Sequence, residues 1–278
     1  MSLMEYLEPR LQKENAPGNG PYYSLDAKGV RVAAEYLRCT LTGAMVACLA
    51  NDVWPLRFCR NRGLFSSAEQ ATLLKSHAAQ IGCGGLGGPT AILLARLGLG
   101  SLTLCDPDTF TESNLNRQRL CREDRLGINK ALAAQDEVRR IASHVTVKAV
   151  PESATRDNIV SLLSGVDVVV DGLDNHESRR LVLQATREAG IPYVYGAIAG
   201  QEGFACLEDA YSGPILDTIL EGRQGDMAEQ RLGTPTLTPT ATAVMQCLLA
   251  IRALLGKPSN SSLWHLDLSV PEIENLLF

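Results

Sequence analysis

The chain has 278 residues, enough for one large α/β domain or for one domain with an extension. Hydrophobic residues make up 45% of the sequence, as in globular proteins with a packed core. The formal net charge of -5 gives no general attraction to nucleic acid or acidic membranes, and no run of about 20 uninterrupted apolar residues predicts a membrane-spanning helix.

The N-terminal part of the chain, residues 1–62, is predicted to form a helical extension in front of a domain that covers 63–278. Residues 1–25 are rich in Pro, Gly and Asn, which predicts little regular structure there. Between 26 and 50, apolar residues recur at every third or fourth position, as on one face of a helix. A further helix is expected to begin after a serine cap at 66 or 67 and to end at 75.

Beyond the extension, segments typical of strands and helices alternate. Strands are predicted at 78–81, 101–105, 145–150, 166–170 and 193–198, with helices at 89–97, 130–141, 155–163 and 176–189. This alternation predicts a doubly wound, mostly parallel sheet with a Rossmann-like nucleotide-binding half. The remainder is expected to add antiparallel or extended strands at 203–207, 263–268 and 272–277, and an apolar helix at 241–255.

A glycine-rich turn follows the first strand of the predicted sheet. It reads Gly82-Cys-Gly84-Gly-Leu-Gly87, which is Gly-x-Gly-x-x-Gly. Glycines permit a tight turn and the close approach of a phosphate, and the free N–H groups at a helix start attract it. Asp106 ends the next strand, where an acid can bind ribose hydroxyls. The pattern favours a nucleotide site over a turn without a ligand, and by itself it leaves NAD, FAD and ATP open.

The strand in front of this turn is unusual for the centre of a sheet. It contains histidine, glutamine and two alanines, so it is polar and small. We expect it to be short, or to be exposed at a contact between subunits.

Charged and amide side chains follow in three short motifs. They are Ser113-Asn114-Leu-Asn116-Arg117-Gln118, Gly127-Ile-Asn-Lys130 and Asp171-Gly-Leu-Asp174-Asn175. Arg117 and Lys130 can neutralise the phosphates of ATP, and Asn114 and Gln118 can donate hydrogen bonds to its oxygens. Asp174 lies beyond the end of a buried strand and can hold Mg²⁺. An NAD-dependent oxidoreductase would not need these cations. The alternatives are surface charges at the two cations and a helix cap at Asp174.

In this order, the motifs resemble the ThiF/MoeB/HesA group of the E1-like superfamily. The resemblance runs from about 57 to 203, with a weaker likeness in the last helix. It implies an adenylyltransferase that uses ATP and Mg²⁺ to activate the C-terminal glycine of a small ubiquitin-fold carrier protein ending in Gly-Gly. The carrier carboxylate would attack the α-phosphorus, forming an acyl-adenylate and releasing pyrophosphate. Enzymes of this type are usually homodimers.

The resemblance also implies roles for individual residues. Asp106 would bind the ribose, Asn114, Arg117 and Lys130 the phosphates, and Asp174 the magnesium ion. A sixth residue, Arg60, matches the second arginine of a family segment that reaches into the partner subunit's site. Here that segment reads Arg57-Phe-Cys-Arg60-Asn61, a partial match, and a solvated charge is the alternative.

The cysteines set this chain apart from many members of the group. None of its eight cysteines forms a Cys-x-x-Cys pair, so we predict no structural zinc. Some relatives carry a cysteine in a loop that crosses over the carrier tail, but this sequence has none between 208 and 237. Chemistry that ends at the adenylate is therefore expected. Scattered thiols without a secretion signal favour a cytoplasmic protein.

Two further functions share the same ATP-site motifs. The sequence also resembles tRNA threonylcarbamoyladenosine dehydratases, but its acidic balance and the lack of a basic stripe argue against a nucleic-acid substrate. A non-catalytic scaffold that retains the fold is the other alternative. Retention of Arg117, Lys130 and Asp174 argues against it.

Overall fold

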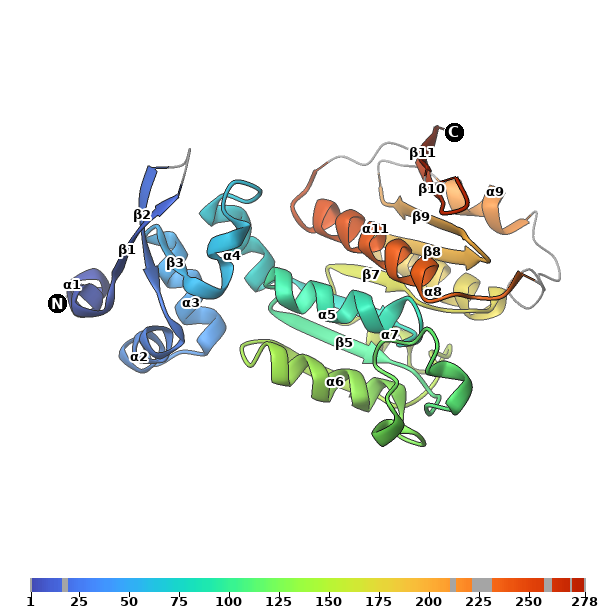
Figure 1. The fold of residues 1–278 in the computed structure, drawn as a ribbon, viewed down its shortest axis with the longest axis horizontal. Helices are drawn as coiled ribbons and strands as arrows, with labels where there is room; N and C mark the ends of the chain where they lie inside the picture. The colour runs from blue at the N-terminus through green and yellow to red at the C-terminus, as the bar shows by residue number, and fades with distance from the viewer. Residues whose placement is uncertain are drawn as a thin grey trace.

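The computed structural model describes residues 2–16, 20–210, 214–221, 232–257, 262–270 and 272–277. Within these ranges two β-sheets organise the chain, one of three strands near the N-terminus and one of eight strands in the remainder (Figure 1). The small sheet and its helices lie at one end of the molecule, beside the larger α/β unit.

The N-terminal part combines helices with a small sheet that the sequence pattern did not predict. Its elements are α1 (Leu3–Leu7), η1 (Glu8–Arg10), β1 (Gln12–Ala16), β2 (Gly20–Leu25), α2 (Ala27–Leu37), α3 (Leu41–Ala50), β3 (Val53–Pro55) and η2 (Leu56–Asn61). The described residues before Asp26 thus carry a helix and a hairpin, although little structure was expected there. These elements enclose an apolar cluster of their own, which Leu74 of the following helix completes.

The single helix expected over 26–50 is two helices, bent by 96° relative to each other. Arg38 ends α2 in the left-handed conformation, with φ at 52°. Thr40 then caps α3, because its hydroxyl accepts a hydrogen bond from the N–H of Gly43 at 3.1 Å. The apolar periodicity continues across the junction between α2 and α3, so the pattern alone did not indicate that the helix ends there.

The large sheet confirms the predicted doubly wound architecture. Its strands are β4 (His77–Ile81), β5 (Ser101–Cys105), β6 (Thr146–Val150), β7 (Val168–Asp171), β8 (Tyr193–Ala199), β9 (Glu202–Glu208), β10 (Ser262–Asp267) and β11 (Glu272–Leu277). They lie in the order β11-β10-β9-β8-β7-β4-β5-β6. Neighbours from β6 to β8 are parallel, whereas β9, β10 and β11 are added antiparallel. The chain order reverses between β4 and β7, which creates the crevice where such sheets bind ligands.

Helices cover both faces of this sheet (Figure 1). The helical elements are α4 (Ser67–Lys75), α5 (Gly87–Leu97), η3 (Glu112–Asn114), η4 (Glu123–Arg125), α6 (Lys130–Ile141), α7 (Ile159–Leu162), α8 (His176–Ala189), α9 (Ile215–Glu221) and α11 (Leu237–Leu254). Helices α5, α6 and α11 share one apolar core with Ala78 and Val168, while α7 and α8 share another with Ala79 and Val169. Alternate strand residues thus enter opposite cores, as the pleat requires.

The first strand, β4, is short, with five residues, but it is not exposed. It lies at the centre of the sheet and is buried from Ala78 to Ile81. The amide nitrogen of Gln80 donates hydrogen bonds to the carbonyls of Gly82 at 3.0 Å and Val170 at 3.2 Å. Gln80, a polar residue that is unusual in a central strand, therefore connects the ends of β4 and β7.

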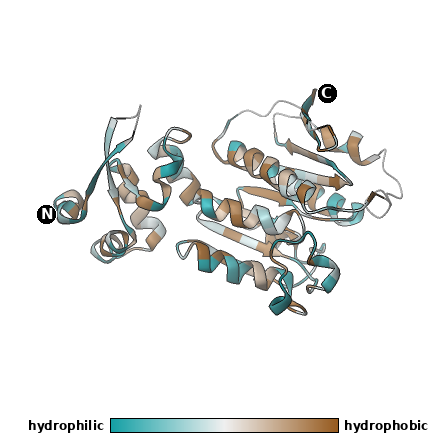
Figure 2. Cartoon of the chain, viewed as in Figure 1, coloured by the Kyte–Doolittle hydropathy of each residue, from teal (hydrophilic) through white to brown (hydrophobic). Residues whose placement is uncertain are grey.

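Helix α11 is apolar on more than one side. By length and composition its 18 residues could cross a membrane, with a mean hydropathy of 1.3, and α2 with α3 together pass the same test. Half of α11 is nevertheless buried in the fold, in contact with β7, β8 and β9. Its outer side exposes Leu237, Val244 and Leu248, and Figure 2 shows much of the helix in the colour of hydrophobic residues.

The N-terminal part contacts the α/β unit at the end of α6. The Thr42 hydroxyl donates to the carbonyl of His144 at 2.7 Å, and a guanidinium nitrogen of Arg57 lies 2.6 Å from Nδ1 of His144. The ring of Phe58 meets the imidazole edge to face, with 5.6 Å between the ring centroids. His144 is only 5% exposed. Burial, assisted by the charge of Arg57, lowers the pKa of His144 to about 4.

This burial predicts a pH dependence of stability. Below pH 6.5 the unfolded chain protonates His144 while the folded chain does not, so stability should fall as the pH drops toward 4. The full effect is on the order of 3 kcal/mol. The variant His144→Asn keeps an acceptor for Arg57 but cannot titrate. Urea unfolding at pH 7 and pH 5 should show a smaller pH-dependent loss in the variant, and an equal loss in both proteins would contradict the prediction.

Candidate functional site

A cavity of about 340 Å³ opens at the carboxyl ends of β4, β5 and β7, where the strand order reverses. Seven of the ten residues predicted for the site line it: Gly82, Gly84, Asp106, Arg117, Gln118, Lys130 and Asp174. Gly87, Asn114 and Arg60 are not among the described residues of its wall. These residues come from five separate segments of the chain and meet in one place.

The glycine loop needs glycine for steric reasons. Gly82 has φ at 88°, and a Cβ atom there would lie 2.4 Å from the carbonyl oxygen of Gly172. Gly87 faces the Gly82 carbonyl so closely that no side chain fits. Gly84 differs, because the nearest atom to a Cβ there would be the Gln118 amide at 3.5 Å. No side chain caps α5, but in its first turn the N–H of Gly88 already donates to the Gly84 carbonyl at 3.0 Å and Pro89 has no N–H. An anion at this helix start would therefore be bound mainly by the glycine loop in front of it.

Asp106 fastens the glycine loop to the end of β5. Its two carboxylate oxygens accept hydrogen bonds from the N–H groups of Cys83 at 2.7 Å and Asp108 at 2.9 Å. The residue is 5% exposed, and burial raises its pKa against the opposing effect of these bonds. Asp106 therefore shapes the loop and also lines the cavity in which it was expected to meet a ribose.

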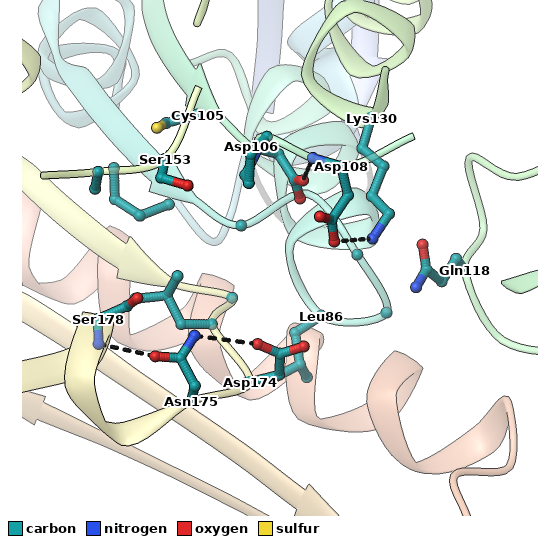
Figure 3. A pocket seen from close by; sticks show the side chains of 18 of the residues that line it. Leu86, Cys105, Asp106, Asp108, Gln118, Lys130, Ser153, Asp174, Asn175 and Ser178 are labelled. Carbon is teal, nitrogen blue, oxygen red and sulfur yellow. Dashed lines mark hydrogen bonds and ion pairs between the residues drawn. The ribbon is translucent and has the colours of Figure 1, made fainter. Parts of the chain in front are cut away.

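Lys130, Arg117 and Gln118 line the cavity, and Lys130 and Gln118 can be followed in Figure 3. Lys130 begins α6, is 8% exposed, and its Nζ lies 2.9 Å from Oδ2 of Asp108. The guanidinium of Arg117 donates to the Ser113 carbonyl and to the Asn116 side chain, both at 2.9 Å. Gln118 is buried beside them, and its Oε1 has no hydrogen-bond partner among the described residues.

Asn114 holds the turn that presents Arg117 and Gln118. It is buried, and its Oδ1 accepts a hydrogen bond from the N–H of Thr111 at 3.1 Å across η3. The structure therefore places Asn114 behind the cavity wall. A direct contact with phosphate, which the resemblance implied, stays a prediction.

Asp174 faces the cavity from the opposite side (Figure 3). The cap of α8 is its neighbour Asn175, whose Oδ1 accepts the N–H of Ser178 at 2.9 Å. Asp174 therefore does not cap the helix, and the contact of its exposed carboxylate among the described residues is with the Asn175 amide, at 3.4 Å. Mg²⁺ usually binds one or two protein carboxylates together with substrate phosphates, and Asp174 fits this requirement.

A closed metal cage is not evident in the part of the chain that the structure describes. No group of three or more His, Cys, Asp or Glu side chains there can hold a metal ion. The sequence-based prediction of no structural zinc remains a prediction.

Arg60 lies at the opposite end of the unit from the cavity. It is exposed in η2, and the neighbouring Asn61 contacts the carbonyl of Leu97, the last residue of α5. The cavity lies at the first residues of that helix. Arg60 therefore cannot complete the cavity of its own chain, and its proposed action in a partner subunit stays a prediction.

The thiols near the site are unsuited to nucleophilic attack. Cys105 lines the cavity, but burial raises its pKa to about 12, and burial places the pKa of Cys83 well above the usual range. Cys206 and Cys247 are buried in the apolar cores, and burial raises the pKa of each.

Sequence reasoning missed the support beneath the Asp174 loop. The sequence motif contains Asp171 without a role of its own, and Arg179 lies beyond the end of that motif. The structure pairs them in the protein interior, with Nε of Arg179 3.0 Å from Oδ2 of Asp171. A charged residue at the end of a continuous run of valines was the available signal, because a buried carboxylate requires a partner.

The reversal in strand order and the glycine loop define a doubly wound nucleotide-binding protein. The model of the ThiF family matches residues 58–276, so the chain belongs to the ThiF family.

Several relatives match by sequence. The chain is 34% identical over 202 residues to the sulfur carrier protein ThiS adenylyltransferase of Bacillus subtilis, covering 72% of this chain and 60% of that protein. It is 30% identical to the adenylyltransferase and sulfurtransferase MOCS3 of Arabidopsis thaliana, covering 73% and 45%. It is 40% identical over 136 residues to the SAMP-activating enzyme E1 of Haloferax volcanii, covering 49% and 50%.

Solved structures share the fold at low sequence identity. MccB of E. coli with ATP has a TM-score of 0.64 at 19% identity, covering 80% of this chain and 70% of that one. The E. coli tRNA N6-threonylcarbamoyladenosine dehydratase TcdA with ATP has a TM-score of 0.63 at 23% identity, covering 73% and 96%. This chain spans 60% or less of the three relatives matched by sequence.

The loop geometry predicts different outcomes for two glycine substitutions. Gly82→Ala forces a positive φ and a clash with backbone, so it should lower the free energy of unfolding by more than about 1 kcal/mol. Gly84→Ala meets only ordinary contacts and should change it by less than about 0.5 kcal/mol. Urea denaturation of the two variants measures both values. Equal stability would mean that the loop does not require glycine at 82.

Proposed function

We propose that this chain is an ATP-dependent adenylyltransferase that activates the C-terminal glycine of a small ubiquitin-fold carrier protein ending in Gly-Gly. The observation that carries the proposal is the convergence of the glycine loop, Arg117, Lys130 and Asp174 on one cavity. The named activities of the relatives support it, since they activate the sulfur carrier ThiS and the protein SAMP. The net charge of -5 argues against RNA as the substrate.

The reaction needs no nucleophile from the enzyme. A carboxylate oxygen of the carrier attacks the α-phosphorus of ATP, the bond from this phosphorus to the bridging oxygen breaks, and pyrophosphate leaves with the electron pair. Arg117 and Lys130 neutralise the charge that develops on the phosphates, and the N–H groups of the glycine loop hold them in place. Asp174 would hold Mg²⁺, which would supply further charge neutralisation at the phosphates.

Chemistry in this chain ends at the acyl-adenylate in our proposal. The sequence has no cysteine between 208 and 237, and the Cys105 thiol of the cavity has its pKa raised to about 12 by burial. Another protein would then supply the sulfur or other acceptor. A carrier of a thiamin, molybdopterin or other sulfur-transfer pathway fits this activation step.

We also propose a cytoplasmic homodimer without a membrane attachment. The exposed apolar side of α11, formed by Leu237, Val244 and Leu248, is a surface that a second copy can cover. Arg60 lies away from its own cavity and is then free to reach the cavity of the partner. The described part of residues 2–62 lies at one end of the molecule (Figure 1), and in this proposal it extends the interface.

Exchange of pyrophosphate into ATP tests the proposed reaction. Purified protein, ATP, Mg²⁺ and labelled pyrophosphate should give exchange only with an added Gly-Gly carrier. Arg117→Ala should reduce the rate by about 100-fold or more, because it removes a charge that stabilises the transition state. Arg119→Ala is the matched control, since Arg119 is exposed and outside the cavity wall.

Failure would also be informative. If ATP binds but no carrier supports exchange, the dehydratase or scaffold alternatives replace the proposal. A wild-type rate in Arg117→Ala would remove its assigned role.

Mixed dimers test the proposed position of Arg60. The variants Arg60→Ala and Asp174→Ala should each be inactive alone. Mixing them should restore up to about a quarter of the exchange activity, because some heterodimers contain one complete site. No recovery after proven subunit exchange would contradict action in the partner subunit.

A further inference from the structure

A buried ion pair lies directly beneath the loop that carries Asp174. Asp171 ends β7 and is fully buried, and Arg179 lies one turn into α8 and is 5% exposed. Neither belongs to the described wall of the cavity. Because both side chains are buried away from the described wall, we assign them an effect on the site that passes through other residues.

The pair holds three structural elements at once. The Arg179 guanidinium donates to the Asp171 carboxylate at 3.0 Å, to the Leu173 carbonyl in the loop, and to the Gly196 carbonyl of β8 at 2.9 Å. The other oxygen of Asp171 accepts the N–H of Leu173 at 2.7 Å. Asp171 and Arg179 thereby connect β7, the following loop and β8.

Further contacts restrain the same loop from its other sides. The N–H of Gly172 donates to the Ile81 carbonyl at 2.7 Å, and the Gln246 amide of α11 donates to the Asp171 carbonyl at 2.6 Å. Asn175 is held by its cap of α8. The backbone on both sides of Asp174 is therefore fixed, whereas its carboxylate points into the cavity (Figure 3).

We infer that Asp171 and Arg179 are positioning residues that aim the Asp174 carboxylate at the Mg²⁺–ATP complex, an inference that rests on the proposed function. A buried ion pair contributes little net stability compared with apolar side chains of similar size, because desolvation offsets the attraction. The contribution of this pair is to fix the position of the loop that carries Asp174. Residues that orient a metal ligand from behind typically change metal affinity by about 10- to 100-fold when they are replaced.

Only an arginine can make this set of contacts. Its planar group reaches a carboxylate and two carbonyls that lie on different elements, whereas a lysine ammonium is a single point charge on a flexible chain. Arg179→Lys keeps the charge and should still lose the bonds to Leu173 and Gly196. We therefore expect Arg179→Lys to weaken Mg²⁺ binding although the ion pair with Asp171 is retained.

The decisive experiment separates positioning from stability. The double variant Asp171→Leu/Arg179→Met removes both charges and fills the space, so its melting temperature should exceed that of either single variant. Its exchange activity should still require about tenfold more Mg²⁺ for half-saturation, with the KM for carrier unchanged. Arg180→Met, on the exposed side of the same helix, is the matched control and should behave as wild type.

Each result decides the question. Wild-type Mg²⁺ dependence in the folded double variant or in Arg179→Lys would overturn the inference. Failure of all these variants to fold would show that the pair is purely structural and would overturn it as well. If wild-type protein shows no exchange, the proposed function fails first. The inference is then tested by calorimetry of ATP binding with and without Mg²⁺, where equal Mg²⁺ effects in wild type and the double variant would reject it.

Discussion

The contact between two loops at the reversal of strand order is the constraint on which the site depends. Gly82 and Gly172 follow neighbouring strands, and they approach so closely that a methyl group on either would meet backbone of the other. The buried amide of Gln80 donates hydrogen bonds to the carbonyls of Gly82 and Val170 and so fixes the distance between the ends of β4 and β7. This contact places the glycine loop beside the loop of Asp174, so the phosphate-binding and metal-binding functions that we propose share one crevice.

Charge is arranged around that crevice in two layers. The layer that lines the cavity carries Lys130, Arg117 and the exposed carboxylate of Asp174, which can meet a ligand. The layer behind it consists of groups whose hydrogen bonds are satisfied within the fold, including Asn114 with the N–H of Thr111 and Asp171 with Arg179. Hydrogen bonds and the ion pair offset the desolvation cost of the buried groups in the second layer. The side chains of the first layer are therefore able to exchange their present contacts for a nucleotide.

The N-terminal elements and helix α11 pack around the sheet that carries the cavity. The N-terminal sheet and helices dock on the end of α6 through Thr42, Arg57 and His144. Helix α11 contributes Gln246 to the Asp171 backbone on its buried side and an apolar stripe on its outer side. The chain thus combines a sheet that carries the cavity with outer surfaces that do not line it.

The sequence by itself determined the parallel strands, the glycine loop and the motifs of Arg117, Lys130 and Asp174, because each depends on local pattern and spacing. Tertiary structure decided what depends on distant residues. It turned the 26–50 helix into two around Arg38, built a small sheet from residues 12–55, and set Asn114 behind the wall. It also assigned the α8 cap to Asn175 and paired Asp171 with Arg179, across eight residues. Periodicity reports which face of an element is apolar, but it does not report which polar groups meet across the fold.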